Sequence, residues 1–415
     1  MSPTVALSCA SPIFNTGCTS LPEVQITAPV YVTQVHEDPD AIPAPEWDDL
    51  LALQAVPTPF MQHAYLAALH RSGSAVAETG WAARFVTLRG ADGRLAAACA
   101  LYLKSHSYGE YVFDWAWADA YRRHGLAYYP KLLAAVPFTP VPGSRLLAED
   151  NAARDALACT LIDLAQKAGL SSAHLLFPDE GDAAALARAG WLMREGVQFH
   201  WTQDTAAPCP DFETLLQRLQ RDKRKKILQE RRRVAEAGVR FEVVAGTAID
   251  EDLWDFFHHC YTLTYEAHHS TPYLTRDFFR EMARHMPQHW VLFVAWRGDE
   301  RIGASLVAVD ATRRVAWGRY WGSTVYVPCL HFEACYYQPL AWCLAEGYQR
   351  FEGGAQGEHK MARGLMPVRT QSAHWLSHPR FSAAVADFLA SESAGIGRYV
   401  DELRERSPFK DEPGG

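Results

Sequence analysis

The sequence predicts a protein of mixed helices and strands, α/β or α+β, made from two copies of one domain fold with antiparallel strands at the centre of each. Three observations support this fold class. The chain of 415 residues is longer than a single hydrophobic core usually requires, helical and strand patterns alternate along it, and one arrangement of strands occurs twice. Hydrophobic residues make up 48% of the sequence, which is enough to fill two cores.

The first half of the chain alternates between strands and helices. A turn at residues 90–93 separates two apolar strands, and we expect a third strand after the turn at residues 106–109, so that an antiparallel meander forms. The apolar patterns around this meander predict a strand at 30–35, helices at 59–73 and 152–168, a strand at 171–178, a helix at 183–189 and a strand at 197–203.

Residues 290–323 repeat the layout of that meander. Phe85 and Val86 correspond to Phe293 and Val294, and an Arg-Gly pair follows each of them at the same distance. Two meanders can resemble each other by chance, but duplication of one domain accounts for the match better. We therefore predict a lead-in over residues 1–28, an N-terminal domain over 29–205, a C-terminal domain over 206–400 and a tail over 401–415.

The composition is typical of a cytoplasmic protein. A formal net charge of -8 gives no general reason to expect nucleic acid or an anionic membrane as partner. The nine cysteines are odd in number and contain no Cys-x-x-Cys pair, which is typical of free thiols in a reducing compartment. We also expect no secretory leader and no membrane span, because no apolar run is long enough.

One strongly basic stretch contrasts with this acidic background. A helix predicted over residues 212–237 carries eight basic and two acidic residues between positions 221 and 233. These cations form either a solvated helix face or a site for an anionic ligand such as phosphate or RNA. The strong local charge favours the ligand, and the candidate phosphate-binding residues are Lys223, Arg224, Lys225 and Lys226.

The stretch from position 319 to 375 concentrates the unusual chemistry of the chain. A strand end rich in aromatic residues leads into an apolar helix, and the segment GGAQG at 353–357 then permits positive φ or close backbone approach. Directly behind it, Glu358, His359 and Lys360 place an acid, a titratable base and a cation side by side. Such a triplet can simply be solvated, but we predict that this corner is the active site.

Several strings of the sequence resemble one protein family. LQRDKRKKILQERRRVAEAGV, RYWG, HFEACYY, GYQRFEGGAQGEHKMARG and TQSAHW, with YLKSHSYGEYVFDWAWADAYRRHGLAYYPKLL in the first half, are similar to the FemAB-like N-acyltransferases over about residues 57–379. The resemblance implies an α/β fold of two GNAT-like domains in tandem, each a mixed, largely antiparallel sheet flanked by helices. It also implies acyl or aminoacyl transfer to an amine. In Fem relatives the donor is an aminoacyl-tRNA and the acceptor is a peptidoglycan precursor.

The sequence departs from ordinary GNAT enzymes at the loop that holds the coenzyme A pyrophosphate. That loop usually presents glycine-rich backbone N–H groups at a helix N-terminus. Residues 322–329 here contain one glycine and a proline, which has no N–H to donate. The donor is therefore either an aminoacyl-tRNA or an acyl-CoA, with acetyl-coenzyme A expected to bind poorly, and no cofactor is assigned.

The resemblance and the residue types together suggest roles in the site. Glu358 or His359 would hold the attacking amine neutral, and Lys360 would neutralise an oxyanion or a phosphate. The candidate substrate-binding residues are Tyr320, Trp321, Glu333, Tyr336, Gln356 and Arg363, with Ser107, Tyr108 and Glu110 in the corresponding corner of the first copy. Aromatic residues at these spacings are also common in cores.

One alternative function stays open at this point, which is a non-catalytic GNAT-like module that binds RNA or an anionic cell-wall precursor through the basic helix. A metal enzyme is not expected. The neighbouring pairs His258-His259 and His268-His269 have no second ligand cluster with zinc-type spacing.

Overall fold

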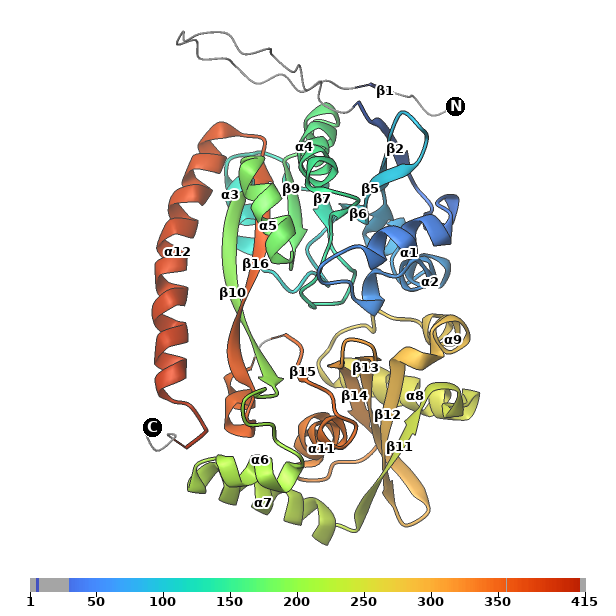
Figure 1. Cartoon of the computed structure of the whole chain (residues 1–415), viewed down its shortest axis with the longest axis vertical. Coiled ribbons are helices and arrows are strands. Elements are labelled where there is room, and N and C mark those ends of the chain that lie inside the picture. The colour runs from blue at the N-terminus through green and yellow to red at the C-terminus, as the bar shows by residue number, and fades with distance from the viewer. Residues whose placement is uncertain (1–4, 7–29, 356, 411–415) are drawn as a thin grey trace.

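The computed structural model describes residues 5–6, 30–355 and 357–410 (Figure 1). The expected lead-in over residues 1–28 lies outside the described residues, apart from Val5 and Ala6, and so does the candidate residue Gln356.

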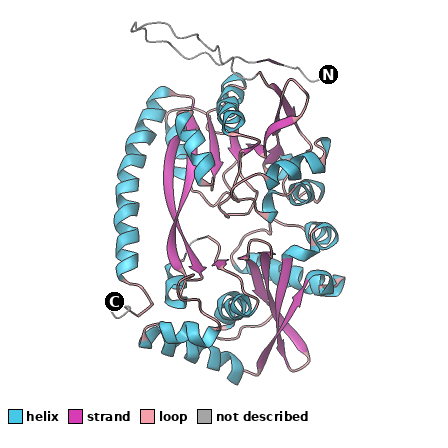
Figure 2. Cartoon of the chain, in the orientation of Figure 1, coloured by secondary structure: helices cyan, strands magenta, loops and turns pink. Residues whose placement is uncertain are grey.

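The first half of the chain confirms the predicted alternation of helices and strands (Figure 2). Its helices are α1 (Ala44–Ala52), α2 (His63–Arg71), α3 (Trp115–Arg123), α4 (Asn151–Lys167) and α5 (Glu180–Arg188). Its strands are β1 (Val5–Ala6), β2 (Val32–His36), β3 (Trp81–Ala83), β4 (Phe85–Arg89), β5 (Leu95–Cys99), β6 (Leu101–Lys104), β7 (Lys131–Ala134), β8 (Leu147–Ala148), β9 (Ser172–Leu176) and β10 (Leu192–Thr202).

The second half begins with two helices and ends with a long one. Its helices are α6 (Phe212–Arg218), α7 (Arg221–Glu236), α8 (Glu251–Ala267), α9 (Arg276–His285), α10 (Leu330–Phe332), α11 (Gln338–Ala345) and α12 (Pro379–Glu405). Its strands are β11 (Val239–Ala245), β12 (Trp290–Arg297), β13 (Glu300–Asp310), β14 (Val315–Ser323), β15 (Arg350–Glu352) and β16 (Met366–Leu376).

Strand pairing shows that the two halves repeat one sheet plan. In the second half, β11, β12, β13 and β14 pair antiparallel in that order, and β15 then lies parallel to β14. In the first half, β2 pairs antiparallel with β4 and β4 with β5, while β6 pairs antiparallel with β7, and β9 lies parallel to β7. The tandem arrangement of mixed, largely antiparallel sheets is confirmed, and the similar order of pairing agrees with the duplication predicted from the two meanders.

Strands β10 and β16 join part of the first half to the second half in one eleven-stranded sheet (Figure 1). The remaining strands of the first half form a separate five-stranded sheet in the order β1, β2, β4, β5 and β8. β10 belongs to the first half of the chain, yet its end pairs with β15, and β16 belongs to the second half, yet it pairs with β9. The two strands also pair antiparallel with each other, from Leu192 opposite His374 to His200 opposite Met366. Strands from both sides of the predicted domain boundary, between residues 205 and 206, therefore pair with each other in the same sheet.

Helices cover both faces of the second-half sheet. Because side chains alternate along a strand, Leu292 of β12 packs in the core beneath α8 and α9, and Phe293 packs in the core beneath α6 and α11. The first of these cores also contains residues of the first half, and the ring centroids of Phe60 and Trp317 lie 5.4 Å apart. The two halves thus share one hydrophobic core.

The prediction of a third strand after residues 106–109 is wrong, because that part of the chain leads into helix α3. Its aromatic residues alternate in the sequence, which suggested a strand. The residues that are buried are Trp117 and Tyr121, which are four positions apart and lie on one helix face, whereas Trp115 is exposed. The partner of β6 in this position is β7, further along the chain.

The basic helix predicted over residues 212–237 is divided into α6 and α7 at Leu219 and Gln220. Leu219 is buried and forms a β-bridge with Phe409, and the backbone N–H of Gln220 donates to Pro408. The segment at residues 408–409 therefore occupies the hydrogen-bonding groups at the point where α6 and α7 separate. Helix α12 continues past position 400, where the sequence analysis placed the start of a tail.

We expect Gly322→Ala to destabilise the fold by about 1–3 kcal/mol or more, as overpacking does. A Cβ atom at this position of β14 would lie 1.9 Å from the carbonyl oxygen of Cys260 on α8, which is backbone and cannot turn aside. Gly395→Ala in α12 is the matched control, because its Cβ would meet nothing within 4 Å. Equal free energies of unfolding for the two variants, measured in urea, would contradict this packing.

Candidate active site

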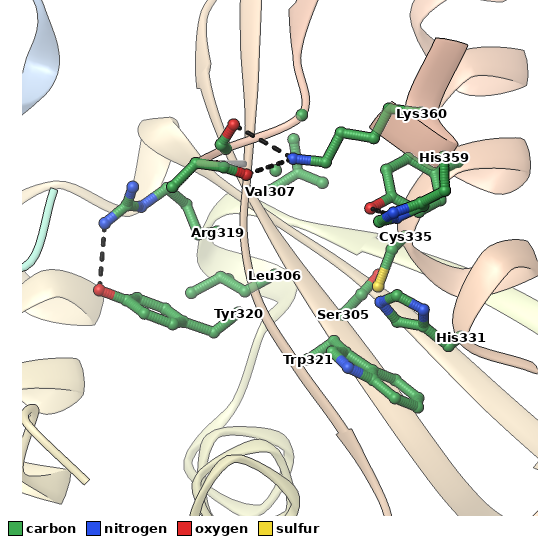
Figure 3. A pocket seen from close by; sticks show the side chains of 15 residues that line it. Ser305, Leu306, Val307, Arg319, Tyr320, Trp321, His331, Cys335, His359 and Lys360 are labelled. Atoms are coloured by element: carbon green, nitrogen blue, oxygen red, sulfur yellow. Dashed lines mark hydrogen bonds between the residues drawn. The ribbon is translucent and has the colours of Figure 1, made fainter. Parts of the chain in front are cut away.

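A cavity of about 260 Å³ opens where β14 and β15 separate (Figure 3). The two parallel strands pair only from Val315 opposite Arg350 to Trp317 opposite Glu352. Beyond this point β14 continues while β15 ends in the glycines of the loop at 353–355. The cavity is lined by Ser305, Leu306, Val307, Gly318, Arg319, Tyr320, Trp321, His331, Cys335, Tyr336, Gly353, Gly354, Ala355, His359 and Lys360.

An irregularity in β14 shapes the wall of the cavity nearest the first half. Leu306 of β13 pairs with Tyr320, but its neighbour Val307 pairs with Gly318, so that Arg319 is an extra residue. Such bulges redirect side chains and are common beside active sites. The guanidinium of Arg319 donates to the backbone carbonyl of Phe138, at 2.9 Å. It also donates to the hydroxyl of Tyr320, at 3.0 Å (Figure 3).

A π-helical turn, η6 (Glu333–Tyr337), supplies the opposite wall. Single π turns inside helices are frequent at functional sites. The hydroxyl of Ser305 donates to the carbonyl oxygen of Ala334 in this turn. Cys335 and Tyr336 of the turn both line the cavity, and burial raises the pKa of the Cys335 thiol well above its usual range.

Lys360 is the buried cation of the site. It lies on the short 3₁₀ helix η7 (Glu358–Arg363), between Gly357 and Gly364, which both have positive φ. Its side chain is buried, and its amine donates to the carbonyl oxygens of Gly354, at 3.2 Å, and Ala355 (Figure 3). Burial lowers the pKa of Lys360 to about 8, so the amine can lose its proton much more readily than an exposed lysine.

Two histidines lie at the edges of the cavity. His359 is exposed, and its Nε2 atom lies 3.3 Å from the hydroxyl of Tyr336. Burial, with Arg363 and Lys360 nearby, lowers the pKa of His359, so its neutral form predominates at pH 7. The ring of His331 lies beside Trp321, with centroids 4.7 Å apart, and burial lowers its pKa to about 4. Both imidazoles are therefore neutral at pH 7.

The structure separates Glu358 from the other two members of the predicted catalytic triplet. Glu358 is exposed and does not line the cavity, and its carboxylate accepts a hydrogen bond from the hydroxyl of Tyr399 on α12, at 3.1 Å. His359 and Lys360 do line the cavity. Of the two candidate bases, the geometry retains His359.

Two of the predicted substrate-binding residues are held in ion pairs behind the cavity wall. Glu333 accepts from Arg231 at 3.1 Å, and Arg363 donates to Glu230 at 3.0 Å. Both are buried, and neither lines the cavity, in contrast to Tyr320, Trp321 and Tyr336.

The corresponding corner of the first half is a closed ionic cluster. Lys131 donates to Ser107 and Glu110, both at 2.8 Å, and also to Asp114. These residues are buried, whereas Tyr108 is 58% exposed. Lys131 is paired with both carboxylates, and none of these residues lines the cavity of the second half.

The predicted phosphate-binding residues lie together on the first turn and a half of α7. Lys225 and Lys226 are exposed, and Lys223 and Arg224 are half-buried. The inner face of the same helix is formed by Ile227, Glu230 and Val234, which are buried.

Ser305, Arg319 and His331 line the cavity but are absent from the sequence prediction. Arg319 and His331 stand inside strings that carried the family resemblance, whereas Ser305 has no local signal because its role depends on a helix 29 residues away. Among the described residues, no three His, Cys, Asp or Glu side chains gather to hold a metal, and no helix there is long and apolar enough to cross a membrane.

A family model described as peptidoglycan biosynthesis/recognition matches residues 38–411, which is most of the chain. The chain belongs to the FemAB-like family. The family supports acyl or aminoacyl transfer as the general activity of this FemAB-like protein.

Several solved structures are similar to this chain, and the first of those named here supports the fold. L-PGS from Bacillus licheniformis is 11% identical, with a TM-score of 0.52, over 85% of this chain and 97% of that one. The C-terminal domain of a protein described as lysylphosphatidylglycerol synthetase, from Agrobacterium fabrum, is 13% identical, with a TM-score of 0.48, over 84% and 95%. A tandem GNAT protein of the clavulanic acid pathway is 14% identical, with a TM-score of 0.44, over 84% and 98%. No curated protein sequence matches the chain.

We expect the amine of Lys360 to titrate near pH 8. Competitive labelling with acetic anhydride across a pH series, read by peptide mass spectrometry, should place the midpoint of Lys360 reactivity there, because burial destabilises the ammonium form. A midpoint above pH 10 would show that the side chain is solvated.

Proposed function

We propose that this FemAB-like protein transfers an aminoacyl group from an RNA ester to the amine of a peptidoglycan precursor, in the cavity between β14 and β15. The observation that carries the proposal is the presence of Lys360, His359 and Tyr336 around one cavity of about 260 Å³. These three groups match the three needs of acyl transfer, which are a hydrogen-bond donor for the oxyanion, a base for the amine and a path for the proton.

In the proposed reaction, the amine nitrogen of the acceptor attacks the carbonyl carbon of the donor ester. The new C–N bond forms as the ester C–O bond breaks. His359, which is neutral at pH 7, takes a proton from the attacking amine. The hydrogen bond between His359 and Tyr336 gives this proton a route to the leaving hydroxyl of the donor.

Lys360 is the proposed oxyanion donor. An ammonium group has three N–H bonds, and two of them are donated to the carbonyl oxygens of Gly354 and Ala355. The third remains for the oxygen that becomes negative during attack. No carboxylate forms an ion pair with Lys360 among the described residues, so its charge is available to a ligand.

The preference for an RNA ester over an acyl-CoA rests on the loop after β14 and on the basic helix. Pro328 lacks an N–H, and Cys329 has a φ of 68°, so this loop is not the glycine-rich cradle that a pyrophosphate requires. Helix α7 supplies cations for phosphates at a different place, on the surface of the second half.

A second cavity, of about 220 Å³, is the proposed entry for the acceptor. It shares Ala355 with the first cavity, so the two adjoin at the loop that also accepts from Lys360. Its lining carboxylates are both paired, Glu392 with Arg194 at 2.7 Å and Glu195 with Arg369 at 3.3 Å, so the second cavity is polar and its charges are balanced. A peptide of a cell-wall precursor is the proposed occupant, in keeping with the description of the family.

We expect Lys360→Met to lower turnover by about 10²–10³, as loss of one oxyanion donor does, while the protein stays folded. The assay is transfer of a labelled amino acid from charged tRNA to a muropeptide amine. Glu358→Gln, two positions away, is the matched control and should change turnover less than about threefold, because its carboxylate lies outside the cavity. Full turnover by a folded Lys360→Met variant would exclude Lys360 as the oxyanion donor, whereas absence of transfer by the parent protein would leave a non-catalytic binding module.

We expect that replacing Lys223, Arg224, Lys225 and Lys226 by Gln weakens RNA binding and lowers its dependence on salt. Each lost phosphate contact reduces the slope of log affinity against log salt by roughly 0.7–0.9. Fluorescence anisotropy with deacylated tRNA measures both quantities. The control removes the same charge elsewhere, from the exposed residues Arg380, Arg398, Arg404 and Arg406. If both variants lost equal affinity and slope, α7 would be an ordinary solvated face.

A further inference from the structure

Helix α7 has an outer and an inner face of opposite character. Lys225, Lys226, Arg232 and Arg233 are exposed on its outer side. On the inner side, Glu230 is buried, and its neighbour Arg231 is half-buried. The outer face can receive an anionic ligand, and the inner face contacts the rest of the protein.

Glu230 connects α7 to the loop that carries Lys360. Its carboxylate accepts from Arg363 at 3.0 Å and from the hydroxyl of Tyr337, and the Arg363 side chain is 3% exposed. Arg363 in turn donates to the backbone carbonyl of His359 at 2.6 Å. Arg363 is therefore the one residue that connects Glu230 of the helix with the peptide group between His359 and Lys360.

Arg231 connects the same helix to the opposite wall of the cavity. Its guanidinium donates to Glu333 at 3.1 Å, and Glu333 also accepts from Gln338 at 2.7 Å. Glu333 is the first residue of the π turn that brings Cys335 and Tyr336 to the cavity. Adjacent residues of one helix thus hold both walls.

These ion pairs make the position of α7 a condition for the shape of the cavity. Breaking a buried pair leaves an uncompensated charge, which is strongly unfavourable. A displacement of α7 must therefore move the two walls with it, and any ligand that fixes α7 fixes the walls.

We propose that RNA bound on the outer face of α7 orders the two walls of the catalytic cavity through the ion pairs of Glu230 and Arg231. The identity of the ligand rests on the proposed function, whereas the connection itself rests on the contacts above. The coupling is reciprocal, because a site that is ordered by RNA also raises the affinity for RNA when its own ligand is bound. Glu230 and Arg231 are positioning residues in this scheme, since they act through Arg363 and Glu333.

A nucleic-acid backbone suits this face better than a single phosphate does. The basic residues extend from Arg221 to Arg233, which corresponds to about 18 Å along a helix. Several phosphates of one strand can contact such a length at once, whereas one phosphate group would leave most of the cations unused.

The alkylation rate of Cys335 by N-ethylmaleimide, read by peptide mass spectrometry, reports the state of the cavity wall. The probe is a blunt RNA duplex, which has no single-stranded 3′ end to enter the cavity and shield the thiol directly. The variants are Arg231→Gln and Arg232→Gln, which remove the same charge from neighbouring positions. Only Arg231 contacts the wall, since Arg232 pairs with Glu236 on its own helix.

In the parent and in Arg232→Gln, saturating duplex should slow the alkylation of Cys335 by at least about fivefold, the lower end of ordinary coupling between sites. In Arg231→Gln, alkylation without RNA should be faster and the effect of RNA should vanish, and Arg231→Lys should restore it in part. Glu230→Gln should likewise remove any effect of the duplex on acetylation of Lys360.

The coupling is overturned if Arg231→Gln behaves as Arg232→Gln does, if bound duplex leaves the parent rate unchanged, or if the duplex does not bind in an anisotropy titration. Failure of the proposed function is a separate result. A protein that transfers no aminoacyl group, yet shows the expected labelling pattern, would keep the coupling and lose the reaction.

Discussion

The separation of two parallel strands is the constraint on which the candidate site depends. β14 and β15 share three residue pairs and then diverge, so the sheet cannot close and the backbone beyond Trp317 borders a cavity. Gly318 stands at the divergence, where a Cβ would approach the ring of Phe351 at 3.3 Å. The bulge at Arg319, the π turn and the glycine-rich loop then supply side chains from three directions, because each departs from regular geometry at this place.

The shared sheet makes the first half part of the site, although its own ionic corner is closed. Arg319 is held by the carbonyl of Phe138, and strand β10 lies next to β15. Removing either half would therefore leave an exposed sheet edge and an unsupported cavity wall. The tandem arrangement is one structural unit in this protein, and the first half supports the candidate cavity of the second half.

The fold, and the cavity beside residues 353–360, could be predicted from the sequence, because both depend on local patterns. Strand alternation, the repeated meander and the glycines around position 357 act over a few residues and can be recognised without a structure. The direction of each side chain cannot be recognised in this way. In a 3₁₀ helix three successive residues point to three sides, so Glu358, His359 and Lys360 could not all face one cavity, and the pairing of Glu333 and Arg363 with α7 depends on contacts across more than 100 residues.

Two of the buried lysines, Lys131 and Lys360, differ in the partners of their amines. Burial alone would lower the pKa of Lys131, but Glu110 and Asp114 raise it above its usual value. The amine therefore stays protonated, and its charge is paired with these two carboxylates. Lys360 has only carbonyl oxygens as partners, and burial lowers its pKa to about 8. A cation that is hydrogen-bonded but not paired with an acid can still form a favourable interaction with an incoming negative charge. The difference follows from the partners of each lysine and not from the lysine itself.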